Sequence, residues 1–127
     1  MQQTVLVIED DPIQLKVLSE RFVSEGFRVL QASDGTSGLS TATSERPDVI
    51  LLDNRMPQMS GYQMLRRLRD SGSWGEKVPV IFFSNVEPSS SEEREDLAAI
   101  APTAYLLKGD TDLTTIVAKI KETLGIA

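Results

Sequence analysis

The sequence predicts an α/β fold in which helices cover both faces of a doubly wound, five-stranded parallel sheet. Short apolar runs alternate along the chain with longer segments whose apolar residues recur at helical spacing. Several of these runs are continuously apolar, which is typical of parallel strands that are buried on both faces. With 127 residues, the chain has the length expected for one domain with its own hydrophobic core.

Strands and helices are expected to alternate from the N-terminus. The five strand candidates are Thr4–Ile8, Phe27–Ala32, Asp48–Leu52, Pro79–Phe83 and Ala104–Leu107. The first helix is expected to begin after Asp11, which serves as its N-cap, with Pro12 in the first turn. Leu15, Leu18 and Phe22 then lie at positions i, i+3 and i+7, so they share one helical face.

The third helix is expected to begin near Gly61, with Leu65 and Leu68 pointing inward. The basic residues of this segment then point outward or lie toward the end of the helix, and these are Arg66, Arg67 and Arg69. After it, three residues that interrupt regular structure predict a loop before the fourth strand: Gly72, Gly75 and Pro79.

The fourth helix is expected to open at a run of serines. Ser89 with Glu92, and Ser90 with Glu93, both fit the capping-box pattern. Because acidic residues favour helix N-termini, we interpret the acidic residues here as a solvated helix rather than a docking site. The last helix has the clearest pattern, with apolar residues at i, i+3, i+4, i+7 and i+11 and a glycine after them: Leu113, Ile116, Val117, Ile120, Leu124 and Gly125.

Right-handed crossovers between five parallel strands favour the flavodoxin-like (βα)5 arrangement with strand order 2-1-3-4-5. In sheets of this kind, ligands bind beyond the carboxyl ends of the strands. The residues at those ends are therefore the candidates for chemistry.

Composition excludes several classes of function. The chain has no cysteine and no histidine, which removes disulfides, thiol nucleophiles, Ser-His triads and thiolate or imidazole metal ligands. Its formal net charge of −6 disfavours direct binding to nucleic acid or to an anionic membrane. There is no apolar run of membrane-spanning length and no basic, signal-like start, so we expect a protein of the reducing cytoplasm.

Complementary side chains follow the predicted strands. Glu9 and Asp10 follow the first, Asp53 the third, Ser84 the fourth and Lys108 the fifth. Strands one and three are neighbours in the expected order, so three carboxylates converge and their repulsion requires a cation. Hard oxygen ligands favour Mg²⁺. A carboxylate can attack a phosphoryl group to give an aspartyl phosphate, and an ammonium and a hydroxyl group suit its oxygens.

Each of these signals is weak in isolation. Taken alone, the acidic triplet 9–11 is better explained as a helix-entry cluster with an N-cap than as a metal site, and a turn around Pro57 and Gly61 explains the loop after Asp53 at least as well as a site does. Ser84 and Lys108 taken singly are ordinary surface residue types. Their conjunction at strand ends that share one crevice is what favours a functional site.

Four segments resemble the signature segments of response-regulator receiver domains: VLVIEDDP, VILLDNRMPQMSG, PVIFFS and AYLLKG. The resemblance covers essentially the whole chain, so residues 1–127 are expected to form one receiver domain of a two-component or phosphorelay system. It implies that Asp53 is the phosphoacceptor and that Asp10 binds Mg²⁺ directly. It further implies that Glu9 acts mainly through bound water, that the backbone carbonyl of Arg55 is a metal ligand, and that Ser84 and Lys108 contact the phosphoryl group.

The same resemblance implies a switch rather than an enzyme, in which the domain assists its own phosphorylation and dephosphorylation. The phosphoryl donor would be a phosphohistidine on a sensor histidine kinase or a histidine phosphotransfer protein. Ser84 would then move toward the phosphoryl group and Tyr105 would turn inward. These movements would alter the face formed by the fourth helix, the fifth strand and the last helix, to which a downstream protein target binds.

Two departures from the family pattern keep an alternative open. Gly109 follows Lys108 where the family usually has proline, and Asn85 follows Ser84 where a smaller residue is common. A receiver-like interaction module that works without phosphorylation therefore remains the alternative. A phosphohydrolase that uses an aspartyl phosphate is disfavoured, because Arg55 stands where such enzymes carry a second aspartate. Whether the chain is a stand-alone regulator or a piece of a larger protein is left open.

Overall fold

A computed structural model describes residues 2–85 and 90–126 of the chain. Its strands form a single sheet of five in the order β2-β1-β3-β4-β5, and every neighbouring pair is parallel. The strands are β1 (Thr4–Ile8), β2 (Arg28–Ala32), β3 (Val49–Leu52), β4 (Val80–Ser84) and β5 (Ala104–Leu107). The predicted fold class and strand order are confirmed, and each strand boundary lies within one residue of its predicted position.

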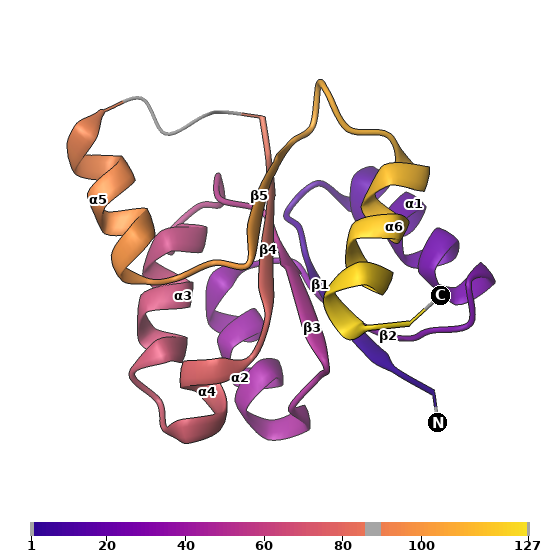
Figure 1. The fold of residues 1–127 in the computed structure, drawn as a ribbon, viewed down its shortest axis with the longest axis horizontal. Helices are drawn as coiled ribbons and strands as arrows, with labels where there is room; N and C mark the ends of the chain where they lie inside the picture. Colours follow the sequence, from indigo (N-terminus) through magenta and orange to yellow (C-terminus); the bar gives the residue numbers. More distant parts are fainter. Residues whose placement is uncertain (1, 86–89, 127) are drawn as a thin grey trace.

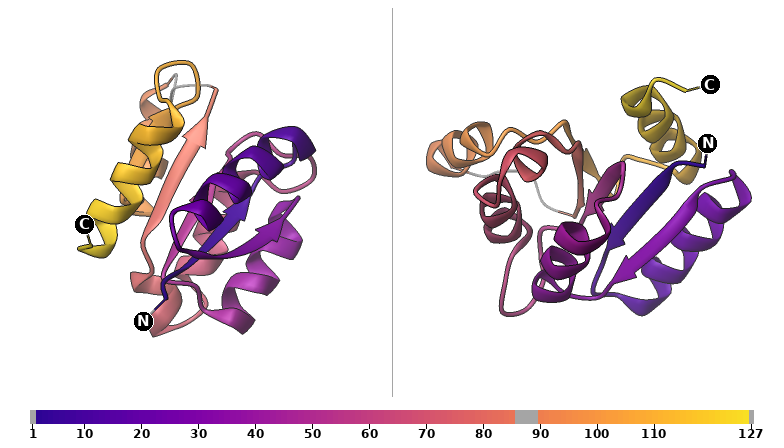
Figure 2. Two further views of the ribbon diagram at one scale, coloured as in Figure 1. Left: turned by 90° about the vertical axis from the view of Figure 1, so that its right-hand side faces the viewer. Right: turned by 90° about the horizontal axis from the view of Figure 1, so that it is seen from below.

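Helices cover both faces of the sheet (Figure 1). Among the described residues they are α1 (Pro12–Ser24), α2 (Gly35–Glu45), α3 (Gly61–Arg69), α4 (Ser73–Lys77), α5 (Ser91–Ala99) and α6 (Leu113–Leu124). Helices α1 and α6 lie on one face, and α2, α3 and α5 lie on the other (Figures 1 and 2). None of the helices in the described part of the chain is long and apolar enough to cross a membrane.

The segment between α3 and β4 corrects one prediction. We expected a loop around Gly72, Gly75 and Pro79, but the short helix α4 lies there. Gly75 is buried inside this helix, and an added Cβ would lie 2.2 Å from the carbonyl oxygen of Leu68. The glycine therefore permits α4 to pack closely against the end of α3, so here it marks a contact between helices rather than a break.

Helix ends follow the predicted signals where the residues are described. The Asp11 side chain accepts hydrogen bonds from the backbone N–H groups of Ile13 and Gln14, so Asp11 is the N-cap of α1. Gly125 ends α6 with a φ of 69°, a left-handed conformation that favours glycine. Of the two predicted capping boxes before α5, Ser89 and the side chains of Glu92 and Glu93 lie outside the described residues.

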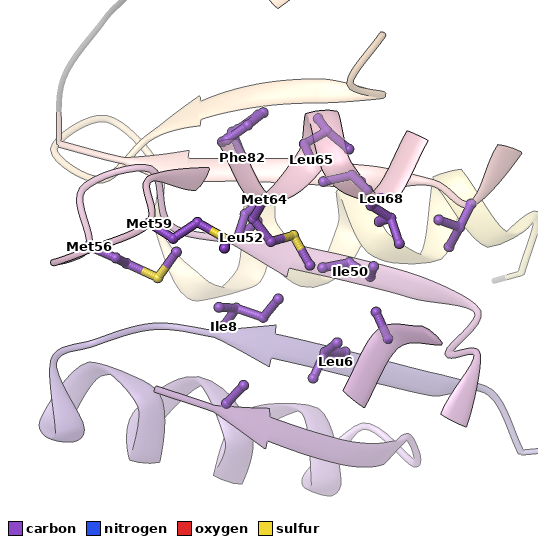
Figure 3. Packing of buried hydrophobic residues seen from close by; sticks show 14 of the residues in the cluster. Leu6, Ile8, Ile50, Leu52, Met56, Met59, Met64, Leu65, Leu68 and Phe82 are labelled. Carbon is purple, nitrogen blue, oxygen red and sulfur yellow. The ribbon is translucent and has the colours of Figure 1, made fainter. Parts of the chain in front are cut away.

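The core has one layer on each side of the sheet. On the α1 and α6 side, Leu18 and Phe22 pack with Ile116, Val117 and Ile120. On the other side, α3 contributes Met64, Leu65 and Leu68, all of which are fully buried as the sequence predicts for the two leucines. Figure 3 shows these α3 side chains over Ile50 and Leu52 of β3. Both faces of the sheet are thus covered by packed helices, and the strands present their carboxyl ends together at one edge.

Candidate functional site

Strand register brings the first two acidic positions together. Ile8, at the end of β1, is paired with Leu52, at the end of β3. The residue after β3 is Asp53, and its backbone N–H donates to the carbonyl oxygen of Ile8 at 3.0 Å. On the other side of β1, the Glu9 N–H donates to the carbonyl oxygen of Ala32, also at 3.0 Å. The backbones of both acidic residues are therefore held by extensions of the sheet ladder.

Three carboxylates form a cluster at this edge. One oxygen each from Glu9, Asp10 and Asp53 lies within 4.8 Å of the other two. Glu9 is 2% exposed and Asp53 is 5% exposed, whereas Asp10 is exposed to solvent. Burial and, next, the negative charge of Glu9 raise the pKa of Asp53, the ammonium of Lys108 lowers it, and the net result is a pKa of about 7. A nearby cation would therefore stabilise the ionised form of these carboxylates.

Lys108 supplies part of that charge. Its Nζ lies 2.5 Å from Oε1 of Glu9 and 3.8 Å from Oδ1 of Asp53. Its backbone N–H donates to the carbonyl oxygen of Ser84 at 2.8 Å, so the end of β4 holds the backbone that carries this lysine. Ser84 itself is fully buried. The structure thus brings together at one edge of the sheet the five residues that the sequence singled out: Glu9, Asp10, Asp53, Ser84 and Lys108.

The donor set fits a hard divalent cation. All three clustered side chains are carboxylates, and oxygen ligands of this kind suit Mg²⁺. The backbone of Arg55 folds back over the same site, since its N–H points to Oδ1 of Asp53 at 3.4 Å. The side chain of Arg55 is exposed. The chemistry of the cluster and the close return of the residue 55 backbone are both compatible with the ligand set that the sequence suggested.

Sequence reasoning missed a residue that shapes the loop after Asp53. The side-chain oxygen Oδ1 of Asn54 accepts a hydrogen bond from the Tyr62 N–H at 3.1 Å, and its carbonyl oxygen accepts one from the Gly61 N–H at 2.9 Å. Asn54 thereby ties the acceptor loop to the first turn of α3. An asparagine beside a candidate acceptor is a signal for local side-chain hydrogen bonding, but the sequence does not say which amide it binds.

The aromatic residue predicted as a switch lies in a line of rings. Tyr105 is half-buried, and its ring stacks on that of Phe82 with centroids 5.4 Å apart and an interplanar angle of 25°. Phe82 in turn makes an edge contact with Tyr62 of α3, again at 5.4 Å. These contacts join β5 to α3 on the side of the sheet that also carries α5. Movement of Tyr105 during signalling stays a prediction.

The loop after Lys108 is open in this structure. An added Cβ on Gly109 would meet no atom within 4 Å, and no peptide bond among the described residues is cis. Asn85, the residue after Ser84, is exposed. Packing against residue 109 therefore does not fix the position of the lysine, and its placement depends on contacts of its own.

Comparisons with known proteins agree on one protein family. The model for the response regulator receiver domain matches residues 5–121. A stretch of 66 residues is 41% identical to TcrX of Mycobacterium tuberculosis, a probable transcriptional regulatory protein, and covers 52% of this chain and 28% of that protein. The matched region is thus less than a third of that relative, whose other functions lie beyond what the match supports.

Solved structures agree over nearly the whole chain. The chemotaxis protein CheY4 of Vibrio cholerae is 25% identical, with a TM-score of 0.86 and coverage of 98% of this chain and 100% of that one. The receiver domain of the sensor histidine kinase PA1611 from Pseudomonas aeruginosa is 27% identical, with a TM-score of 0.84 and coverage of 98% and 99%. That structure has a magnesium ion coordinated in its active-site cleft.

Proposed function

The chain belongs to the response regulator receiver family, and on this premise we propose that it is a signalling switch in which Asp53 accepts a phosphoryl group from a partner phosphohistidine. The observation that carries the proposal is the arrangement around Asp53. This buried carboxylate lies in a cluster with Glu9 and Asp10, and the ammonium of Lys108 is 3.8 Å from it. Such a site combines a nucleophile with positive charge for the oxygens of the transferring group.

Each side chain has a chemical task in the transfer. Glu9, Asp10, Asp53 and the carbonyl of Arg55 would hold Mg²⁺, which supplies positive charge toward the carboxylates and the phosphoryl oxygens. An oxygen of ionised Asp53 attacks the phosphorus, the phosphorus–nitrogen bond to the donor imidazole breaks, and the imidazole keeps that electron pair. Lys108 Nζ and the Ser84 hydroxyl donate hydrogen bonds to phosphoryl oxygens.

The output of the switch is a change of surface. Ser84 at the end of β4 and Tyr105 on β5 are the residues through which the phosphoryl group would alter the face made by α5, β5 and α6. A ligand shifts such an equilibrium only by its differential interaction with two states, so these elements need alternative arrangements of similar free energy. The target of this face is expected to be a protein, because the net charge of −6 disfavours nucleic acid.

We propose that the donor protein docks on an exposed apolar patch of α1. Ile13 and Val17 are four residues apart on α1, so they share one face of the helix, and they are 75% and 40% exposed. Helix α1 begins directly after the carboxylates of the site, because Asp11 is its N-cap. A phosphohistidine protein that contacts this patch would bring its imidazole to Asp53.

The first test is the intact mass after incubation with acetyl phosphate, with and without Mg²⁺. We expect wild type to gain one phosphoryl group only when Mg²⁺ is present. Asp53→Asn removes the nucleophilic oxygen at nearly constant shape, so it is expected to gain none. Labelling of Asp53→Asn would contradict the assignment of the acceptor. A wild-type protein that is never modified, by acetyl phosphate or by a phosphohistidine donor, would favour the phosphorylation-independent interaction module.

A second test separates docking from chemistry. Ile13→Ser removes most of an exposed side chain without disturbing the core, so we expect phosphotransfer from a cognate phosphohistidine protein to slow by about tenfold. Labelling by acetyl phosphate should stay at the wild-type rate, because a small donor does not need the patch. Val23→Ser is the matched control, since Val23 is 60% exposed at the far end of the same helix. Equal effects of Ile13→Ser and Val23→Ser would rule out a local docking surface.

A further inference from the structure

Lys108 has one contact that the proposed chemistry does not use. Its Nζ lies 5.6 Å from the centroid of the Phe83 ring, over the ring face. A cation within about 6 Å of an aromatic face is attracted by the ring quadrupole, and more strongly where water is excluded. Both partners are shielded here, because Phe83 is 4% exposed and the Lys108 side chain is 14% exposed.

Phe83 is a rigid partner for the lysine. It belongs to the core layer between the sheet and helices α1 and α6, which also contains Ile116 and Val117. Its backbone is fixed within β4, in register with Leu106 of β5. Burial in this layer restricts movement of the ring, so the ring offers the ammonium of Lys108 a contact of fixed position.

The other contacts of Nζ are of a different kind. Glu9 and Asp53 are themselves candidates for metal and phosphoryl chemistry, so their oxygens are not free to hold Lys108 throughout the reaction. Gly109 gives no packing support to the loop, since nothing lies within 4 Å of an added Cβ there. The face of Phe83 can hold an ammonium without competing for metal ligands.

We propose that Phe83 is a positioning residue, whose ring face keeps the ammonium of Lys108 over the acceptor site. The inference rests on the proposed function, in which Lys108 donates to the phosphoryl group. Weakening the ring quadrupole without changing its shape should slow phosphorylation by about three- to tenfold, the range that a cation–π contact of ordinary strength allows. The Mg²⁺ concentration for half-maximal labelling should not change, because a phenyl ring offers no metal ligand and the three clustered carboxylates are left in place.

The experiment replaces Phe83 with phenylalanines that carry increasing numbers of fluorine atoms, and measures acetyl phosphate labelling against Mg²⁺ concentration. The expected result is a labelling rate that falls stepwise with fluorination at a constant Mg²⁺ midpoint. A rate that is independent of fluorination would overturn the proposal. If wild type itself takes no phosphate, the proposed function fails instead, so the two failures are distinguishable.

A second readout does not depend on activity. The ε-methylene protons of Lys108 should be shifted upfield by the ring current in the NMR spectrum of the metal-free protein, and Phe83→Leu should remove that shift. Phe82→Leu is the matched control, because it removes a ring from the opposite face of the same strand. We expect Phe82→Leu to leave the Lys108 shift in place. Loss of the shift in both variants, or in neither, would show that Phe83 does not hold Lys108.

Discussion

Replacing Arg69 with methionine is expected to lower the free energy of unfolding by about 3 kcal/mol, a large part of the stability of an ordinary domain. The guanidinium of this residue, at the end of α3, binds four backbone carbonyls. Its Nη1 donates to Gly75 and Val78 at 3.0 and 2.7 Å, its Nε to Ile100 at 3.0 Å, and its Nη2 to Ala101 at 3.0 Å. Partial burial of this charged group lowers the pKa of Arg69 from its ordinary value.

These four bonds join the segments that lead into β4 and β5. Methionine has a similar length and helix propensity but no donor, so the carbonyls would lose their partners and some would stay shielded from water. Ala101 has a φ of 48°, an uncommon conformation for a residue with a side chain, and the bond from Arg69 helps to hold it. The loss should therefore exceed that of a single neutral hydrogen bond.

Urea denaturation of Arg69→Met and of Arg67→Met would measure this effect. Arg67 is exposed on the same helix, so its replacement should change the free energy of unfolding by no more than about 0.5 kcal/mol. If both variants unfold at the same urea concentration, the four carbonyls find other partners or water without cost. In that case Arg69 would be an ordinary surface residue despite its hydrogen bonds.

The fold could be predicted from the sequence because each strand and most helices are marked by a pattern of residues that are close together in the chain. In β1 the four residues Val5 to Ile8 are all buried, and the length and apolar character of this run are enough to predict a buried strand. The convergence of Glu9, Asp53 and Lys108 followed from strand order, since parallel strands end at the same edge. The roles of these residues in phosphoryl transfer stay predictions.

The remaining features depend on contacts between residues far apart in the chain. Arg69 had the pattern of a helix-terminal cation, and nothing nearby in sequence pointed to Ile100 and Ala101 as its partners. The ring of Phe83 had the pattern of a strand residue, and its contact with Lys108 exists only because β4 and β5 pair. Helix α4 was not predicted, because a glycine such as Gly75 looks the same in the sequence whether it interrupts a helix or allows a helix to pack closely against its neighbour.

Gly61→Ala is expected to impair both stability and phosphorylation. An added Cβ at this position would lie 2.6 Å from the carbonyl oxygen of Asp53 and 2.8 Å from Cα of Asn54, so two of its nearest contacts are backbone atoms of the acceptor loop. It would also lie 2.9 Å from the ring of Phe82. Because the sheet holds Asp53, relief requires α3 to move away or the loop to shift. Overpacking of this kind costs about 1 to 3 kcal/mol of unfolding free energy.

The expected functional effect is a slower and more metal-demanding reaction. The loop that carries Arg55 is tied to α3 through Asn54, whose carbonyl and side-chain oxygens bind the N–H groups of Gly61 and Tyr62. A shift of α3 therefore displaces the residue 55 backbone relative to Asp53, and misplacement by about 1 Å can lower a reaction rate by about a hundredfold. We expect acetyl phosphate labelling to fall by at least about tenfold. The Mg²⁺ concentration for half-maximal labelling should rise.

A glycine next to the site, but without neighbours, provides the control. Gly109 follows Lys108 directly, and a Cβ there would meet nothing within 4 Å, so Gly109→Ala should label at close to the wild-type rate with unchanged stability. Thermal unfolding and mass spectrometry of both variants would measure the two effects together. A Gly61→Ala protein that is destabilised yet phosphorylated normally would show that the acceptor loop keeps its geometry when α3 moves. Loss of phosphorylation with the raised Mg²⁺ requirement would instead show that contact between α3 and the loop positions the acceptor site.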